Sequence, residues 1–129
     1  MSTVIIVEDD ADLSFIYNYF FTSRGWKVVS IRSGTEAFDR IQSIIYETHL
    51  NDAAIVLDLH LPGRSGDEIY EMIEFHGAAS RVLICSAYTK EVDAYIRKGA
   101  RALRKPASYE EMESILKEIL QRKIEIRLV

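Results

Sequence analysis

Four short polar segments follow apolar runs in the sequence and carry side chains that could do chemistry together. They are Glu8-Asp9-Asp10, Asp58, Ser86 and Lys105-Pro106. Two carboxylates about 4 Å apart repel by about 4 kcal/mol at an effective dielectric constant near 20, so a carboxylate cluster needs a proton or a cation. Hard oxygen ligands without a cluster of His or Cys favour Mg²⁺, which takes only a few protein oxygens. A nucleophilic carboxylate, a metal ion, a hydroxyl and a lysine together provide what phosphoryl transfer needs.

Each segment also has a purely structural interpretation. The acidic triplet could be a solvated loop in which Asp10 or Asp12 caps the helix that follows. Ser86 could be a turn residue, and Lys105 an ordinary surface lysine. The chemical interpretation therefore depends on a fold that brings the four segments together.

Five short apolar runs alternate with five helical patterns. The runs span residues 4–7, 28–31, 53–57, 82–85 and 102–103. Most of them are continuous rather than alternating, which is typical of parallel strands covered on both faces. Between the runs, apolar residues recur with helical spacing. Ser33 with Glu36 and Ser108 with Glu111 have the spacing of helix-capping pairs.

This alternation predicts a single-domain α/β fold, a (βα)5 doubly wound parallel sheet with right-handed crossovers. Ligands of such sheets bind at the carboxyl ends of the strands. All four polar segments follow predicted strands, so we expect them to share one edge of the sheet.

Composition limits the classes of protein to consider. The chain has 129 residues with 48% hydrophobic and 28% charged side chains, which is typical of one soluble domain. Its apolar stretches are too short to span a membrane, and its start does not resemble a signal peptide, so we expect a cytoplasmic protein. A net charge of −4 argues weakly against direct nucleic acid binding. The single cysteine, Cys85, lies in an apolar run and is expected to be buried.

The motifs resemble those of response regulator receiver domains of two-component signalling, including the chemotaxis-regulator type. The similar segments are residues 7–10, 56–66, 85–88 and 104–106. The resemblance covers nearly the whole chain and implies the flavodoxin-like strand order 2-1-3-4-5. It also implies a cis peptide bond before Pro106.

The resemblance implies a role for three of these residues in phosphoryl transfer. Asp58 would be the phosphoacceptor, receiving a phosphoryl group from a histidine kinase or a histidine phosphotransfer protein in a phosphorelay. Ser86 would hydrogen-bond one phosphoryl oxygen, and Lys105 would pair with another. The domain would catalyse its own phosphorylation and dephosphorylation, with no separate substrate turned over.

The resemblance also implies a magnesium site. Asp9 and Asp58 would bind Mg²⁺ directly and Glu8 through water, and the backbone carbonyl of His60 would supply a further oxygen. No other cofactor is expected.

The sequence departs from the family pattern at the expected switch. Ala102 stands where receivers usually carry an aromatic residue that moves together with the hydroxyl residue. We hypothesise that Tyr88 replaces this aromatic, or that the switch works through the fourth helix alone. His60 and Tyr88 also occupy positions that flank the path of the hydrolytic water in the family, so they either tune the phosphoryl lifetime or are two exposed loop residues without kinetic effect.

Residues 1–123 are expected to form the receiver domain and residues 124–129 a C-terminal tail, with no output domain in this chain. A basic run lies near the fourth helix and fifth strand: Arg97, Lys98, Arg101 and Arg104. It is either a solvated face or part of a surface made by helix 4, strand 5 and helix 5 that contacts an output domain or a second copy.

Two other classes of function remain open. A degenerate receiver would bind partners without phosphorylation. A small enzyme on the same fold is less favoured: Glu8-Asp9-Asp10 repels the phosphate that a flavodoxin-type loop binds, and His60 replaces the second Asp usual in aspartate-nucleophile phosphatases.

Overall fold

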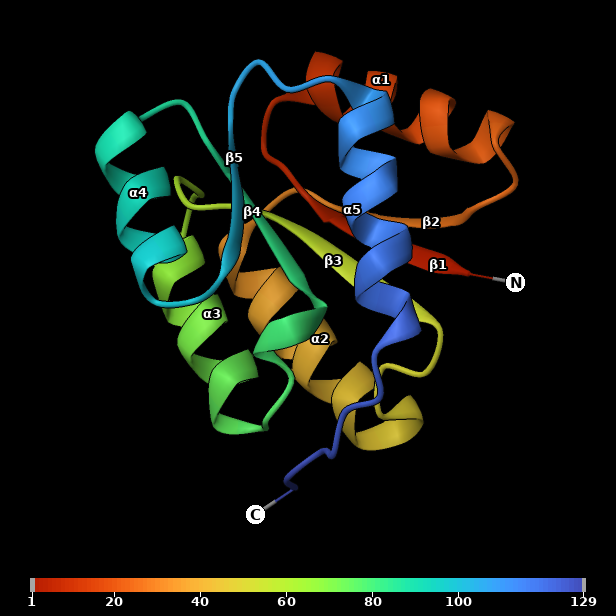
Figure 1. The fold of residues 1–129 in the computed structure, drawn as a ribbon, viewed down its shortest axis with the longest axis vertical. Coiled ribbons are helices and arrows are strands. Elements are labelled where there is room, and N and C mark those ends of the chain that lie inside the picture. Colours follow the sequence, from red (N-terminus) through yellow and green to blue (C-terminus); the bar gives the residue numbers. More distant parts are fainter. Residues whose placement is uncertain (1, 129) are drawn as a thin grey trace.

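Five parallel strands alternate with five α-helices in the computed structural model, which describes residues 2–128 (Figure 1). The strands are β1 Thr3–Val7, β2 Lys27–Ile31, β3 Ala53–Asp58, β4 Val82–Ser86 and β5 Arg101–Arg104. The helices are α1 Ala11–Ser23, α2 Gly34–Thr48, α3 Gly66–Phe75, α4 Thr89–Arg97 and α5 Tyr109–Gln121, and a short 3₁₀ helix, Ala79–Arg81, precedes β4. This order confirms the predicted (βα)5 pattern.

The strands form one parallel sheet in the order β2-β1-β3-β4-β5, as the resemblance implied. Successive residues of each central strand point to opposite faces, because the side-chain period of a strand is two residues. In β1, Ile5 packs on the side of α2 and α3, while Ile6 packs on the side of α1 and α5. Both faces are therefore buried, which explains why the strand sequences are continuously apolar.

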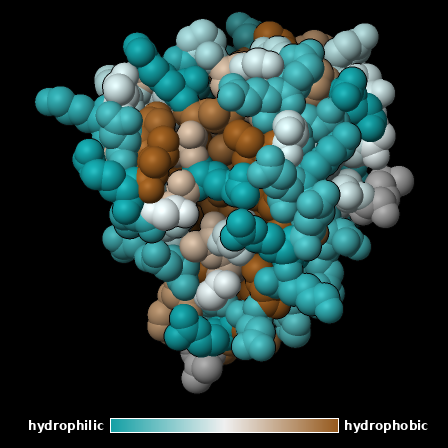
Figure 2. Space-filling model, viewed as in Figure 1, coloured by the Kyte–Doolittle hydropathy of each residue, from teal (hydrophilic) through white to brown (hydrophobic). Residues whose placement is uncertain are grey.

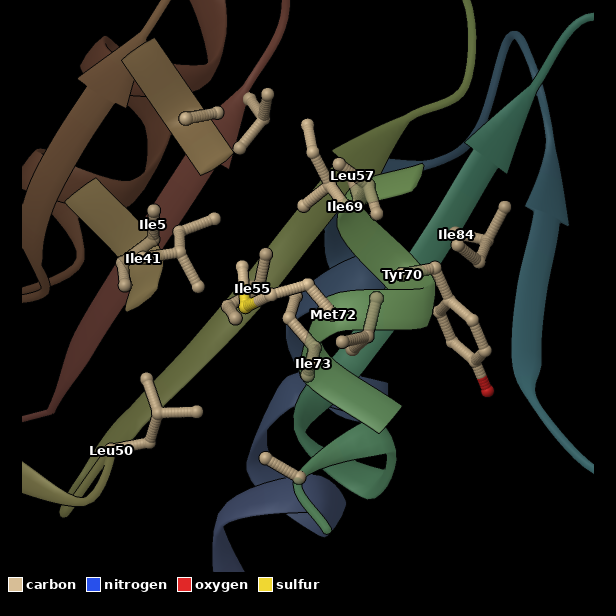
Figure 3. Packing of buried hydrophobic residues seen from close by; sticks show 14 of the residues in the cluster. Ile5, Ile41, Leu50, Ile55, Leu57, Ile69, Tyr70, Met72, Ile73 and Ile84 are labelled. Carbon is tan, nitrogen blue, oxygen red and sulfur yellow. The ribbon is translucent and has the colours of Figure 1, made fainter. Parts of the chain in front are cut away.

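The larger core cluster lies between the sheet and the α2–α3 layer. Figure 3 shows Ile69, Met72 and Ile73 of α3 lying against the central strands, which contribute Ile55 and Leu57 of β3. The second cluster lies between the sheet and the pair α1–α5. The sheet is thus the middle of three layers, and its carboxyl edge is left free to carry a site.

Serine side chains begin three of the helices. The hydroxyl oxygens of Ser33 and Ser108 accept the amide protons of Glu36 and Glu111, at 3.1 and 3.2 Å, which confirms the predicted pairs. A complete capping box, with the return bond from a glutamate, occurs instead at Ser65 and Glu68. It fixes the start of α3 directly after the loop that follows β3.

That loop is held by close backbone packing. A Cβ atom on Gly66 would lie 2.2 Å from the carbonyl oxygen of Asp58, and one on Gly34 would lie 1.6 Å from the carbonyl oxygen of Arg64. The Gly34 amide also donates to the carbonyl of Pro62 at 2.8 Å. Glycine is required at both positions, because a side chain at Gly66 would displace the backbone of Asp58 and one at Gly34 would displace the backbone of Arg64.

After α5 the chain crosses to the α2–α3 side, at the end of the molecule opposite the loops that follow the strands (Figure 1). The Arg127 amide donates to the carbonyl of His76 at 2.8 Å, and the Tyr46 hydroxyl donates to the carbonyl of Leu128 at 3.0 Å. Ile124 and Ile126 pack against the larger core cluster. The division into a domain and a tail at residue 123 stays a prediction.

Within residues 2–128, none of the helices combines the length and apolar composition needed to cross a bilayer.

Candidate functional site

The carboxyl ends of the strands bring most of the predicted residues to one cleft of about 400 Å³, and Ser86 lies buried beside it. Glu8 follows β1, Asp58 ends β3, Ser86 ends β4 and Lys105 follows β5. The cleft is lined by Glu8, Asp9, Asp10, Leu13, Asp58, His60, Ala87, Tyr88 and Lys105. The peptide bond between Lys105 and Pro106 is cis, as the resemblance implied.

Three carboxylates face one another in this cleft. Glu8, Asp9 and Asp58 each offer an oxygen, and these oxygens lie within 4.8 Å of one another. Glu8 is 3% exposed and Asp58 is 7% exposed, whereas Asp9 is open to solvent. A group of hard oxygen donors that is buried on one side and open on the other fits a divalent cation such as Mg²⁺ that keeps part of its water.

The ammonium group of Lys105 lies between the two buried carboxylates. Its Nζ is 2.6 Å from Oε1 of Glu8 and 3.3 Å from Oδ2 of Asp58. Burial raises the pKa of Glu8 to about 7, although the hydrogen bond from Lys105 partly opposes this. Burial lowers the pKa of Lys105, but the hydrogen bond and charge of Glu8 outweigh it, so the net shift is upward and the ammonium stays charged.

Asp10 lines the cleft and also caps helix α1. Its carboxylate accepts the amide of Leu13 at 2.9 Å and so caps α1. The structural interpretation of the acidic triplet therefore holds for Asp10, while Glu8 and Asp9 face the cleft.

The hydroxyl of Ser86 points to a residue that the sequence analysis missed. It donates to Oε1 of Glu91, in the first turn of α4, at 2.6 Å. The same carboxylate lies 2.9 and 3.0 Å from Nε2 of His60. Burial raises the pKa of Glu91, but the hydrogen bonds to Ser86 and His60 together lower it by more. The net shift is downward and the carboxylate is ionised. Nothing in the sequence around Glu91 marks it, because its contacts depend on how α4 is placed over β4.

His60 and Tyr88 form a rim over the cleft. Their rings have centroids 5.1 Å apart and an interplanar angle of 63°. The Tyr88 amide also donates to Oγ of Ser86 at 3.1 Å. Ala102 lies in β5 opposite Ile84 of β4, so a methyl group stands at the position of the usual aromatic.

Comparison with known proteins identifies the family. The model of the response regulator receiver domain matches residues 4–117. A putative transcriptional regulator from Haloferax volcanii is 27% identical over 119 residues, which are 92% of this chain and 19% of that protein. Sporulation initiation phosphotransferase F from Bacillus subtilis is 26% identical over 85 residues, which are 66% of this chain and 64% of that protein. The chain thus spans less than two thirds of either relative's length.

Solved structures share the fold. The response regulator protein TrrA from Thermotoga maritima, crystallised in complex with Mg²⁺-BeF, superposes with a TM-score of 0.77 at 20% identity, covering 93% of this chain and 100% of that one. At 20% identity, this similarity supports a shared fold only.

Proposed function

Because the chain belongs to the family of response regulator receiver domains, we propose that it is a phosphoacceptor switch that is phosphorylated on Asp58. The observation that supports this most is the position of Lys105, whose ammonium lies 3.3 Å from the Asp58 carboxylate and 2.6 Å from Glu8 in an open cleft. The donor would be a histidine kinase or a histidine phosphotransfer protein of a phosphorelay. We place the protein in the cytoplasm.

The proposed reaction is an in-line displacement at phosphorus. An oxygen of Asp58 forms a bond to phosphorus while the bond from phosphorus to the donor's histidine nitrogen breaks, which leaves an acyl phosphate on Asp58. Lys105 stabilises the equatorial oxygens, and Ser86 donates a hydrogen bond to one of them. Attack of water on phosphorus later releases inorganic phosphate and restores the carboxylate.

Glu8, Asp9 and Asp58, with the backbone carbonyl of His60, would hold Mg²⁺. When bound, the cation would neutralise charge on the nucleophile and on the phosphoryl group. The complex of the Thermotoga maritima protein with Mg²⁺-BeF supports this assignment by likeness.

The output of the switch would pass through the surface formed by α4, β5 and α5. Figure 2 shows hydrophobic side chains gathered on this side of the molecule around β5, with hydrophilic side chains around them. Ile96 of α4 is 52% exposed, and Leu103 of β5 is half-buried. We propose that an output domain or a second copy of this chain docks here.

Acetyl phosphate with MgCl₂, followed by intact mass spectrometry, tests the proposal. We expect a gain of about 80 Da, the mass of one phosphoryl group on the carboxylate. The gain should be absent in Asp58→Asn and in the presence of EDTA, and unchanged in the control Asp39→Asn. An unmodified wild-type chain would refute the proposal and favour an interaction module that works without phosphorylation.

A further inference from the structure

Ser86 and Glu91 form the shortest contact between β4 and α4 at the rim of the cleft. The Ser86 hydroxyl accepts the Tyr88 amide at 3.1 Å and donates to Glu91 at 2.6 Å. A hydroxyl has one hydrogen to donate. While Ser86 donates to Glu91, it cannot donate to a phosphoryl oxygen on Asp58.

Asp58 and Ser86 lie on neighbouring strands, since Asp58 pairs with Cys85 in the parallel register. A phosphoryl group on Asp58 therefore adds up to two negative charges beside the end of β4. Glu91 is itself an anion with its side chain 32% exposed, so the two anions repel and compete for one proton donor.

We propose that Glu91 is a positioning residue that holds the Ser86 hydroxyl away from Asp58 in the unphosphorylated domain and releases it when the phosphoryl group arrives. This inference rests on the proposed phosphorylation of Asp58. It assigns to Glu91 the link between the site and α4 that the small side chain of Ala102 cannot supply.

The rest of α4 is held in place while its first turn responds. Glu91 is the third residue of this helix, and in the next turn the Tyr95 hydroxyl donates to the Asp67 carboxylate of α3. Tyr95 is also buried against the larger core cluster. Release of the Ser86 hydroxyl by Glu91 thus removes the hydrogen bond that ties the first turn of α4 to β4, next to the surface proposed for output.

The test measures the affinity of the full chain for beryllofluoride in the presence of Mg²⁺, by NMR titration. We expect Glu91→Ala to bind beryllofluoride about tenfold more tightly than the wild type, because a hydrogen bond to a charged group no longer competes. The affinity for Mg²⁺ alone should change by less than about twofold, because Glu91 contacts the imidazole of His60 rather than its backbone carbonyl and makes its other hydrogen bond to Ser86. Asp93→Ala removes an exposed charge from the same helix and should match the wild type.

A double-mutant cycle separates the contact from other effects of Glu91. In a Ser86→Ala background, Glu91→Ala should change beryllofluoride affinity by less than about twofold, since its partner is gone. Equal or weaker binding by the single Glu91→Ala variant, or an undiminished effect in the Ser86→Ala background, would overturn the inference. Failure of the wild type to bind beryllofluoride would instead count against the proposed function.

Discussion

Lys105 places a positive charge between two buried carboxylates that would otherwise repel each other. Its contacts with Glu8 and Asp58 join the ends of β1, β3 and β5. A cation that enters the cleft therefore meets carboxylates already arranged around an ammonium group. The site is held together by charge before any ligand binds.

The lifetime of the acyl phosphate is predicted to depend on His60 and Tyr88, whose rings lie over the cleft. Their side chains are both about 60% exposed, and their rings are in edge contact over the cleft. Replacing both, as His60→Asn with Tyr88→Glu, should open a path for water and shorten the lifetime roughly fivefold, a barrier change of about 1 kcal/mol. Intact mass spectra recorded after removal of the phosphodonor follow the decay. Tyr46→Phe, far from the cleft, is the control, and an unchanged decay rate in the double variant would show that the rim has no kinetic role.

Sequence alone could place most of this site, for a physical reason. Glu8, Asp58 and Lys105 each follow an apolar run, and parallel strands bring such positions to one edge. Glu91 could not be found in this way, because its contact with Ser86 depends on the side-chain direction of a helix. The same holds for Glu113, whose partners are 87 and 89 residues away in sequence.

At the scale of elements, α5 is tied to the turn between α1 and β2 by the buried carboxylate of Glu113. It accepts hydrogen bonds at 2.8 Å from Nε of Arg24 and from Nε1 of Trp26. The hydrogen bond from Arg24 lowers the pKa of Glu113, against the opposing effect of burial, and Trp26 lowers it further. Trp26 is thereby buried beside α5.

Glu113→Gln should lower the free energy of unfolding by about 2 kcal/mol at neutral pH, because the buried negative charge that accepts hydrogen bonds from buried Trp26 and from Arg24 at the surface is lost. Since the folded-state pKa of Glu113 is lowered, its contribution is complete above the ordinary pKa near 4.5 and is lost as the pH falls below it. Urea unfolding at pH 7 and at pH 3 measures this difference. Exposed Glu110→Gln on the same helix is the control, and a deficit that persists at pH 3 would contradict the electrostatic explanation.

The loop between β3 and α3 leaves no room for a side chain at Gly66. Gly66→Ala would place a carbon 2.2 Å from the Asp58 carbonyl oxygen, so the backbone next to the phosphoacceptor must move. We expect a loss of at least about 2 kcal/mol in unfolding free energy, as for other steric changes in packed regions. Phosphorylation by acetyl phosphate should also slow. Gly99→Ala is an informative comparison, because a Cβ there meets no atom within 4 Å even though φ is +87°; it should spare phosphorylation.

Some elements could be predicted from the sequence more clearly than others. Central strands were clear because both faces are apolar, whereas β5 showed only Ala102-Leu103 between two arginines. As an edge strand, β5 pairs on one side only and tolerates polar ends. The 3₁₀ helix before β4 has no periodicity long enough to predict.

At the scale of the whole molecule, the cleft and the segment after α5 lie at opposite ends of the sheet. The carboxyl end carries the cleft, and the opposite end is closed by the segment after α5. The strand order followed from the family resemblance, whereas the packing of residues 124–128 had no signal in the sequence because it forms neither helix nor strand. Its contacts are made with α2 and α3, far away in sequence.

Replacing both Ile124 and Ile126 by alanine should lower the free energy of unfolding by roughly 1–2 kcal/mol, because two half-buried side chains lose contact with the core. The rate of phosphorylation by acetyl phosphate should stay the same, since these residues lie at the other end of the molecule. Chemical denaturation and intact mass spectrometry check the two expectations. Leu128→Ala, more exposed, serves as the control, and a slower phosphorylation would indicate coupling between the ends.

The path of the last residues also bears on how the protein can be handled in binding assays. The segment after α5 runs to the end of the molecule away from the carboxyl ends of the strands (Figure 1), and Asp58 is the last residue of β3, so a chain fused after this segment would extend away from the cleft. Immobilising the protein through that end on a biosensor surface should leave the cleft facing the solution. A kinase or phosphotransfer protein could then approach unobstructed, whereas tethering through α1 would crowd it.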